Sequence, residues 1–274
     1  MGELPLVLFT VLSQMAAGAF ITLYILDVKG KQFSLETGKL STIVIFITTV
    51  VSILLSSFHL GHPLGATKMF TNIGSSWLSR EAVLFAVFLI LLVGYYTQWK
   101  PDKASTRTQL GGVTAIVAFL AITASGMIYV LPARPAWNNF APVLFFWLTA
   151  ALSGPLFIGT LFAIKGEKIL NLLLPTAIVI GIGLTSFLIY TSLLVSSTGL
   201  VQATGINMLN SSLFWGKLLL NWLVPLIIIL ASVLWKKKLD TKLVTVVFLM
   251  VLVGEIIGRA LFYGSIEALK IIGS

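Results

Sequence analysis

Residues 170–195 read LNLLLPTAIVIGIGLTSFLIYTSLLV, an apolar run without a charged side chain. A helix that spans a bilayer needs about 20 such residues. Lipid offers no partner to the backbone, so only helices and closed barrels cross it. Barrel strands would appear as short segments of alternating polarity, and the run is long and continuous. Comparable runs occupy approximately residues 5–26, 40–60, 81–98, 110–131, 140–164, 213–235 and 243–264. The sequence therefore predicts an all-α, polytopic integral membrane protein with about eight transmembrane helices.

The composition agrees with this fold class. Of the 274 residues, 58% are hydrophobic and 10% are charged, with a mean hydropathy of +1.03, whereas soluble domains are about 25% charged. Only short polar stretches separate the runs, so we expect residues 1–274 to form a single transmembrane helical bundle. No basic segment precedes the first run, which favours a retained helix over a cleaved signal peptide.

The basic residues predict the orientation of the bundle. Cytoplasmic loops of membrane proteins collect lysine and arginine. Twelve of the eighteen basic residues follow the first, third, fifth and seventh runs: Lys29, Lys31, Lys39, Lys100, Lys103, Arg107, Lys165, Lys168, Lys236, Lys237, Lys238 and Lys242. We therefore expect these four loops in the cytoplasm and both termini outside. The net charge of +9 follows largely from the same loops, so it is not read as a sign of nucleic-acid binding.

A smaller set of ionisable groups maps to the opposite end of the predicted helices, which we expect to be the outer end. They are His59, His62, Lys68, Arg80, Glu81, Arg134, Lys217, Glu255 and Arg259. Ionisable side chains at membrane depth are costly, and they commonly mark a functional site. The sequence therefore predicts polar chemistry on one side of the membrane.

The two histidines end the second run, in His59-Leu60-Gly61-His62-Pro63. Two imidazoles on one helix end cannot clamp a haem from both faces, and the chain has no cysteine for an iron–sulfur cluster. We expect no metal, haem or cluster in this chain. Hydrogen bonding and proton transfer remain, because a histidine titrates near neutral pH. The alternative is a pair of interfacial histidines that meet only headgroups and water.

The third run opens with Ser76-Trp77-Leu78-Ser79-Arg80-Glu81. Ser79 is suited to cap the helix, and a carboxylate in the first turn suits the helix dipole, which would give Glu81 a structural role. A short outer loop between antiparallel helices would instead bring Glu81 to His59. The two side chains would then form a proton-accepting pair.

The last run contains Gly254-Glu255-Ile256-Ile257-Gly258-Arg259. Glu255 and Arg259 have the spacing of an ion pair within one helix, which either locks packing or places Arg259 in a pocket. Gly254 and Gly258 permit close approach of a neighbouring helix. Near the outer interface, Trp215-Gly216-Lys217 and Arg134-Pro135-Ala136-Trp137 are typical of an aromatic belt; Lys217 and Arg134 could alternatively meet an acidic partner.

Taken together, these stretches resemble the membrane-anchor subunit of the DMSO reductase family. The likeness runs through most of the chain and is strongest in three places. They are Glu3-Leu4-Pro5-Leu6-Val7-Leu8-Phe9-Thr10 with Gln14 and Gly18, the segment from His59-Leu60-Gly61-x-Pro63 to Ser76–Glu81, and Gly254-Glu255-x-Ile257-Gly258-Arg259 through Phe262-Tyr263-Gly264.

The resemblance implies a haem-free, eight-helix, multi-pass subunit of the bacterial cytoplasmic (inner) membrane. Such a subunit holds a ferredoxin-like iron–sulfur subunit and a molybdopterin catalytic subunit on its outer, periplasmic face. It is an enzyme component of anaerobic respiration that oxidises quinol, with menaquinol favoured over ubiquinol as the exchangeable substrate. Electrons pass to the iron–sulfur subunit, and the chain is not expected to act alone.

The resemblance also assigns residues. It makes His59 and Glu81 catalytic, and it gives a quinol-binding set of His59, Gly61, Pro63, Arg80, Glu81, Glu255 and Arg259. One departure is Gly65, where the family usually carries a basic residue, and Lys68 is the nearest replacement. Two other functions stay open: a polytopic transporter, and a structural anchor without quinone chemistry.

Overall fold

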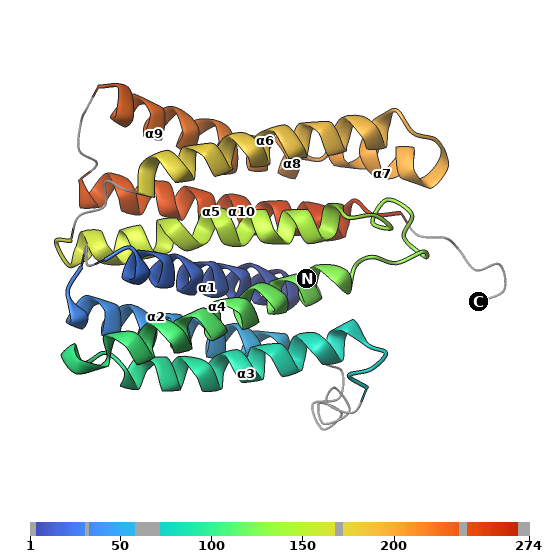
Figure 1. Cartoon of the computed structure of the whole chain (residues 1–274). Helices are drawn as coiled ribbons and strands as arrows, with labels where there is room; N and C mark the ends of the chain where they lie inside the picture. Colours follow the sequence, from blue (N-terminus) through green and yellow to red (C-terminus); the bar gives the residue numbers. More distant parts are fainter. Residues whose placement is uncertain (1–3, 31–32, 58–71, 168–171, 236–239, 268–274) are drawn as a thin grey trace.

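The computed structural model describes residues 4–30, 33–57, 72–167, 172–235 and 240–267, and in these ranges it contains helices and no strand (Figure 1). Eight helical spans are long and apolar enough to cross a membrane. They are α1 (Leu4–Val28), α2 (Leu35–Ser57), α3 (Trp77–Thr97), α4 (Ala104–Met127), α5 (Ala141–Ile164), α6 (Leu173–Val195), α10 (Thr241–Gly264), and a compound span of α8 (Ser212–Lys217), η4 (Leu218–Leu223) and α9 (Val224–Leu234). The predicted polytopic all-α fold is confirmed.

Helix α1 lies at the centre and packs against α2, α4, α5 and α10. The contact with α5 depends on small residues: a side chain at Gly18 would overlap the backbone carbonyl of Ala150. Membrane helices commonly associate through close backbone approach of this kind. The hydrophobic effect does not drive their association, because lipid tails are as apolar as the helix surfaces, so van der Waals packing has to do so. The first helix is thereby held against helices from the second half of the chain.

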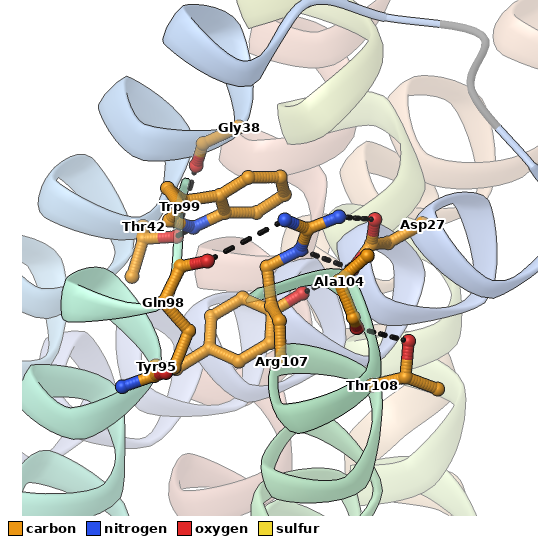
Figure 2. A network of polar contacts seen from close by, with 9 residues as sticks. All are labelled: Asp27, Gly38, Thr42, Tyr95, Gln98, Trp99, Ala104, Arg107 and Thr108. Carbon is orange, nitrogen blue, oxygen red and sulfur yellow. Dashed lines mark hydrogen bonds and ion pairs between the residues drawn. The ribbon is translucent and has the colours of Figure 1, made fainter. Parts of the chain in front are cut away.

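At one end of the bundle, on the left of Figure 1, lie the C-terminal ends of α1, α3, α5 and α9, each of which leads into one of the lysine-rich loops; this is the lysine-rich end. There the short helix η2 (Pro101–Lys103) leads into α4, and the Arg107 guanidinium lies 2.8 Å from both carboxylate oxygens of Asp27 on α1 (Figure 2). Arg107 is buried, and its guanidinium stacks on Trp99. Arg107 therefore lies within α4 and not in the connecting loop where the hydropathy runs placed it, and it pairs with a buried carboxylate.

The same network extends to two more helices. The hydroxyl of Tyr95 on α3 donates to Asp27, and the indole N–H of Trp99 donates to Thr42 on α2, at 2.8 Å (Figure 2). The polar side chains of this network all have hydrogen-bond partners in the protein, as expected because an unpaired polar group is costly to bury in a medium of low dielectric constant. The network joins α1, α2, α3 and α4 at the lysine-rich end.

The opposite end carries a helix that the hydropathy pattern did not predict. Helix α7 (Gly199–Asn210) begins at Gly199, which has a positive φ of 60°, and packs against α6 and α8. Gln202, Thr204 and Asn207 interrupt its apolar character, so the segment gives no spanning signal. It covers the second half of the bundle at the end opposite the lysine-rich loops (Figure 1).

The orientation of the bundle stays a prediction, and the absence of cysteine makes it directly measurable. Ser105, beside the lysine-rich loops, and Asn138, at the other end, are both exposed. In intact cells that express this protein alone, an impermeant maleimide should label Asn138→Cys, and it should label Ser105→Cys only after the membrane is opened. The reverse pattern would contradict the assignment of the lysine-rich loops to the cytoplasm.

Candidate functional site at the end opposite the lysine-rich loops

Helix α3 begins one turn earlier than the sequence suggested. Ser76 is the N-cap, and its hydroxyl accepts a hydrogen bond from the backbone N–H of Ser79. Ser79 therefore lies inside the helix and is not its cap. Glu81 falls in the second turn, beyond the reach of the strongest helix-dipole effect, so the dipole does not account for a carboxylate here.

Glu81 is almost fully buried, with 4% of its surface exposed. Its described hydrogen-bond partner is the Ser125 hydroxyl on α4, which donates to Oε1. The same hydroxyl lies 3.0 Å from the carbonyl oxygen of Ala121. A hydroxyl donates one proton at a time, so Ser125 can serve either acceptor. It can donate to an ionised Glu81, or accept from a protonated Glu81 and donate to Ala121.

A pair of tyrosines lies beside this carboxyl. The Tyr263 hydroxyl on α10 donates to that of Tyr129, just beyond α4, at 2.7 Å. Desolvation raises the pKa of Tyr129 well above its ordinary value; neighbouring Tyr263 and Glu81 act in the same direction, and Arg259 opposes them. Tyr129 therefore stays neutral, and both Glu81 and Arg259 lie within its electrostatic reach.

Glu255 and Arg259 lie in a second buried cluster and do not form the direct ion pair that their spacing predicted. Glu255 accepts hydrogen bonds from Thr149 and Asn221, both at 2.9 Å, and its salt bridge is with Lys217, at 3.5 Å. Lys217 is buried, so it belongs neither to an interfacial belt nor to a partner surface, and both predictions for this lysine are wrong. Glu255 is therefore paired with a cation on the neighbouring span and not with Arg259 on its own helix.

Arg259 finds its partners on two other helices. Its Nη2 donates to Gln14 of α1 at 2.7 Å and approaches the Thr149 hydroxyl at 3.3 Å, while the guanidinium covers the ring of Phe146 at 3.7 Å. Thr149 consequently bridges Arg259 and Glu255. The cluster joins α1, α5, α10 and the compound seventh span.

The glycines of α10 allow this cluster to form. A Cβ at Gly254 would lie 2.8 Å from the backbone nitrogen of Asn221, and one at Gly258 would overlap the Lys217 side chain. The predicted close helix approach at these two glycines is confirmed. Any larger residue would push Lys217 and Asn221 away from Glu255.

The structure brings together only some of the residues that the sequence assigned to the site. Arg80 is directed away from Glu81: its guanidinium donates to the carbonyl oxygens of Ile73 and Gly74 and covers Trp77. His59, Gly61, Pro63, Gly65 and Lys68 lie outside the described residues, so their placement stays a prediction, as does the expectation of no bound metal.

The sequence analysis did not assign four residues that hydrogen-bond within these clusters: Gln14, Ser125, Thr149 and Asn221. Gln14 and Asn221 interrupt apolar runs, and a polar amide within such a run indicates a buried polar contact. Ser125 and Thr149 give no such signal, because hydroxyls are frequent in membrane helices and usually bond their own backbone.

A family model, described as "DMSO reductase anchor subunit (DmsC)", matches residues 1–265 of the sequence. The protein belongs to this family. It is 29% identical to the C subunit of the anaerobic dimethyl sulfoxide reductase of Haemophilus influenzae and 26% identical to the C subunit of that of Escherichia coli K12. It is also 28% identical to YnfH, an anaerobic dimethyl sulfoxide reductase subunit of E. coli K12. Each match covers 96% of this protein and 94% of the relative.

Family membership confirms the resemblance drawn from the three sequence stretches. The protein is a multi-pass membrane protein and the membrane anchor of a DMSO reductase complex, in which it associates with other subunits.

The contact between Ser125 and Glu81 can be measured by a double-mutant cycle. Ser125→Ala should lower the free energy of unfolding by about 1–3 kcal/mol, because it leaves a buried carboxyl without its donor. Combining it with Glu81→Met, which removes the acceptor, should reveal a coupling above the roughly 0.6 kcal/mol typical of hydrogen bonds between membrane helices.

The matched control is Ser232→Ala. The Ser232 hydroxyl is buried and donates to the carbonyl of Ile228 in its own helix, so its loss should be additive with Glu81→Met. Additivity at Ser125 as well would contradict the described contact.

Proposed function

We propose that this anchor subunit oxidises a quinol at its outer end and passes the electrons to a partner subunit on the same face. The observation that carries the proposal is Glu81: a buried carboxyl in the second turn of α3, with a hydroxyl partner able to serve either protonation state. In the sequence, His59 ends the predicted second run, and α3 is the next helix along the chain. A mostly apolar pocket with a few placed polar groups is the usual environment for such a ligand.

Conversion of a quinol to a quinone releases two electrons and two protons, so the site needs proton acceptors. Glu81 would accept a proton from one quinol hydroxyl. As it does so, the Ser125 hydroxyl would turn from Glu81 to the Ala121 carbonyl, and no buried group would lose its partner. Burial disfavours the ionised form of a carboxyl, which makes Glu81 a better base than an exposed glutamate.

His59 would accept a hydrogen bond from the same quinol hydroxyl and relay its proton to Glu81, which would pass it to the outer aqueous phase. The proton of the second hydroxyl would leave by the same route after Glu81 has released the first. Gly61, Pro63 and Arg80 would shape the loop side of the pocket. Arg259 and Glu255 would supply polar groups on the α10 side. We expect menaquinol as the exchangeable substrate, with ubiquinol as the alternative.

The electrons would leave to a ferredoxin-like iron–sulfur subunit docked on the outer face, and from there to a molybdopterin catalytic subunit. The relatives are subunits of anaerobic dimethyl sulfoxide reductases, and we extend that activity to the complex that this protein anchors in the bacterial inner membrane. Electrons and protons would then leave on one side, so this step would not itself build a membrane potential.

Replacing Glu81 tests the proposal. In membranes that contain the whole complex, Glu81→Gln should lower quinol-dependent substrate reduction by at least about 100-fold, the usual effect of losing a general base. Reduction with an artificial donor, which bypasses the anchor, should stay unchanged.

The control is Glu36→Gln, because Glu36 is an exposed carboxyl near the start of α2, at the lysine-rich end. It should leave both activities intact. Full quinol-dependent activity in Glu81→Gln would contradict the proposal and favour a structural anchor.

A further inference from the structure

A groove runs along the outside of the bundle between α2 and α3, in the halves of these helices nearest the lysine-rich end. Its lining comprises Thr42, Ile43 and Phe46 of α2 and Leu92, Val93 and Tyr96 of α3. Thr42 and Leu92 are almost fully buried and form its floor, whereas Ile43 and Val93 are exposed at its rims. The groove is therefore open to the surrounding lipid, and the proposed quinol chemistry at Glu81 makes no use of it.

The lining offers a ligand few polar groups. The Thr42 hydroxyl on the floor donates to the carbonyl oxygen of Gly38 at 2.9 Å and accepts from the Trp99 indole at 2.8 Å, so its proton is already used. The other hydroxyl of the lining belongs to Tyr96, in the last turn of α3. A quinol ring has two hydroxyls to satisfy, and burying one without a partner is costly. An acyl chain has no polar atom to satisfy, so it suits this floor better.

Lys39 places a positive charge at the end of the groove that contains Tyr96. Its Nζ lies 5.0 Å from the centre of the Tyr96 ring, and the side chain is exposed. Lys39 precedes Ile43 by one turn of α2, so both lie on the face that borders the groove. In the described part of the chain, no carboxylate lies within salt-bridge distance of Lys39. Its charge is therefore available to an anionic group.

The lysine-rich end as a whole carries an excess of positive charge. Twelve basic residues map to this end in the sequence, against five carboxylates: Asp27, Glu36, Asp102, Glu167 and Asp240. Basic residues beside membrane spans attract anionic lipids, and basic pockets between spans bind their headgroups. An apolar groove that ends at a lysine therefore matches a ligand with a hydrocarbon chain and a negatively charged head.

We propose that the groove between α2 and α3 binds an anionic phospholipid, with an acyl chain along the floor and the phosphate at Lys39. A zwitterionic phospholipid would bring its own cation next to Lys39 and should bind less tightly. The bound lipid would contact α2 and α3 together and stabilise their packing beside the hydrogen bond between Thr42 and Trp99. The proposal does not depend on the quinol chemistry at Glu81.

The absence of cysteine allows a direct test. Ile47 is exposed one turn beyond Ile43 on α2, so a bimane label on Ile47→Cys would lie beside the groove. The labelled full chain is placed in phosphatidylcholine nanodiscs with increasing fractions of brominated phosphatidylglycerol or brominated phosphatidylcholine. Brominated phosphatidylglycerol should quench the label with a half-quenching mole fraction about fivefold lower, the effect of one basic residue on an anionic lipid. Equal quenching by the two lipids would overturn the proposal.

Two variants separate the headgroup from the acyl chain. Lys39→Met should raise the half-quenching mole fraction of brominated phosphatidylglycerol by about fivefold, because it removes the charge at the phosphate. Val93→Trp should abolish the preference for phosphatidylglycerol, because the indole would fill the groove while every lysine remains. Both positions are exposed, so neither replacement disturbs the core. An unchanged value in Lys39→Met, or an unchanged preference in Val93→Trp, would contradict the proposal.

The matched control is Lys242→Met, which removes an exposed lysine at the same end but on α10. It should quench as the parent does. Sodium phosphate, added at constant ionic strength, should leave the quenching by brominated phosphatidylglycerol unchanged, because free phosphate lacks the chain that holds the lipid in the groove. Loss of this quenching with sodium phosphate would assign Lys39 to a free anion and overturn the proposal.

Discussion

A polar group inside a membrane bundle must find its partner within the protein, because lipid provides none. Three buried contacts in this protein follow from that constraint: Asp27 with Arg107, Glu81 with Ser125, and Glu255 with Thr149, Asn221 and Lys217. Each joins helices that are separated in sequence. Packing alone would leave the helices free to slide against one another, whereas these contacts fix their register.

The contacts differ in what they leave available for chemistry. At the lysine-rich end, both carboxylate oxygens of Asp27 are bound to one guanidinium (Figure 2). That carboxylate is fully committed, and its position is structural. At the opposite end, Glu81 has one described hydroxyl partner, which can also donate to a backbone carbonyl. A carboxyl held in this way can gain and lose a proton without reorganising the bundle.

The spans could be predicted from the sequence because hydropathy is a local property: the run at 140–164 is α5 to within one residue. The partners of Glu255 could not be predicted, because the spacing of Glu255 and Arg259 along α10 does not show which residues of a neighbouring helix face Glu255. The nearest cation in the structure is Lys217, on a different span. The contact of Ser125 with Glu81 could not be predicted for the same reason. The predicted start of α3 was wrong because Ser76 and Ser79 are the same residue type and are equally suited to cap a helix.

The central claim is the proposal that Glu81 belongs to a quinol site at the end of the bundle opposite the lysine-rich loops. The most direct measurement is a density map of the whole complex in lipid nanodiscs with a bound quinol analogue. The ring of the analogue should lie with one oxygen within hydrogen-bonding distance of Glu81, and with His59 on the same ligand. A ring seated instead against Lys217 and Arg259, with none beside Glu81, would contradict the account.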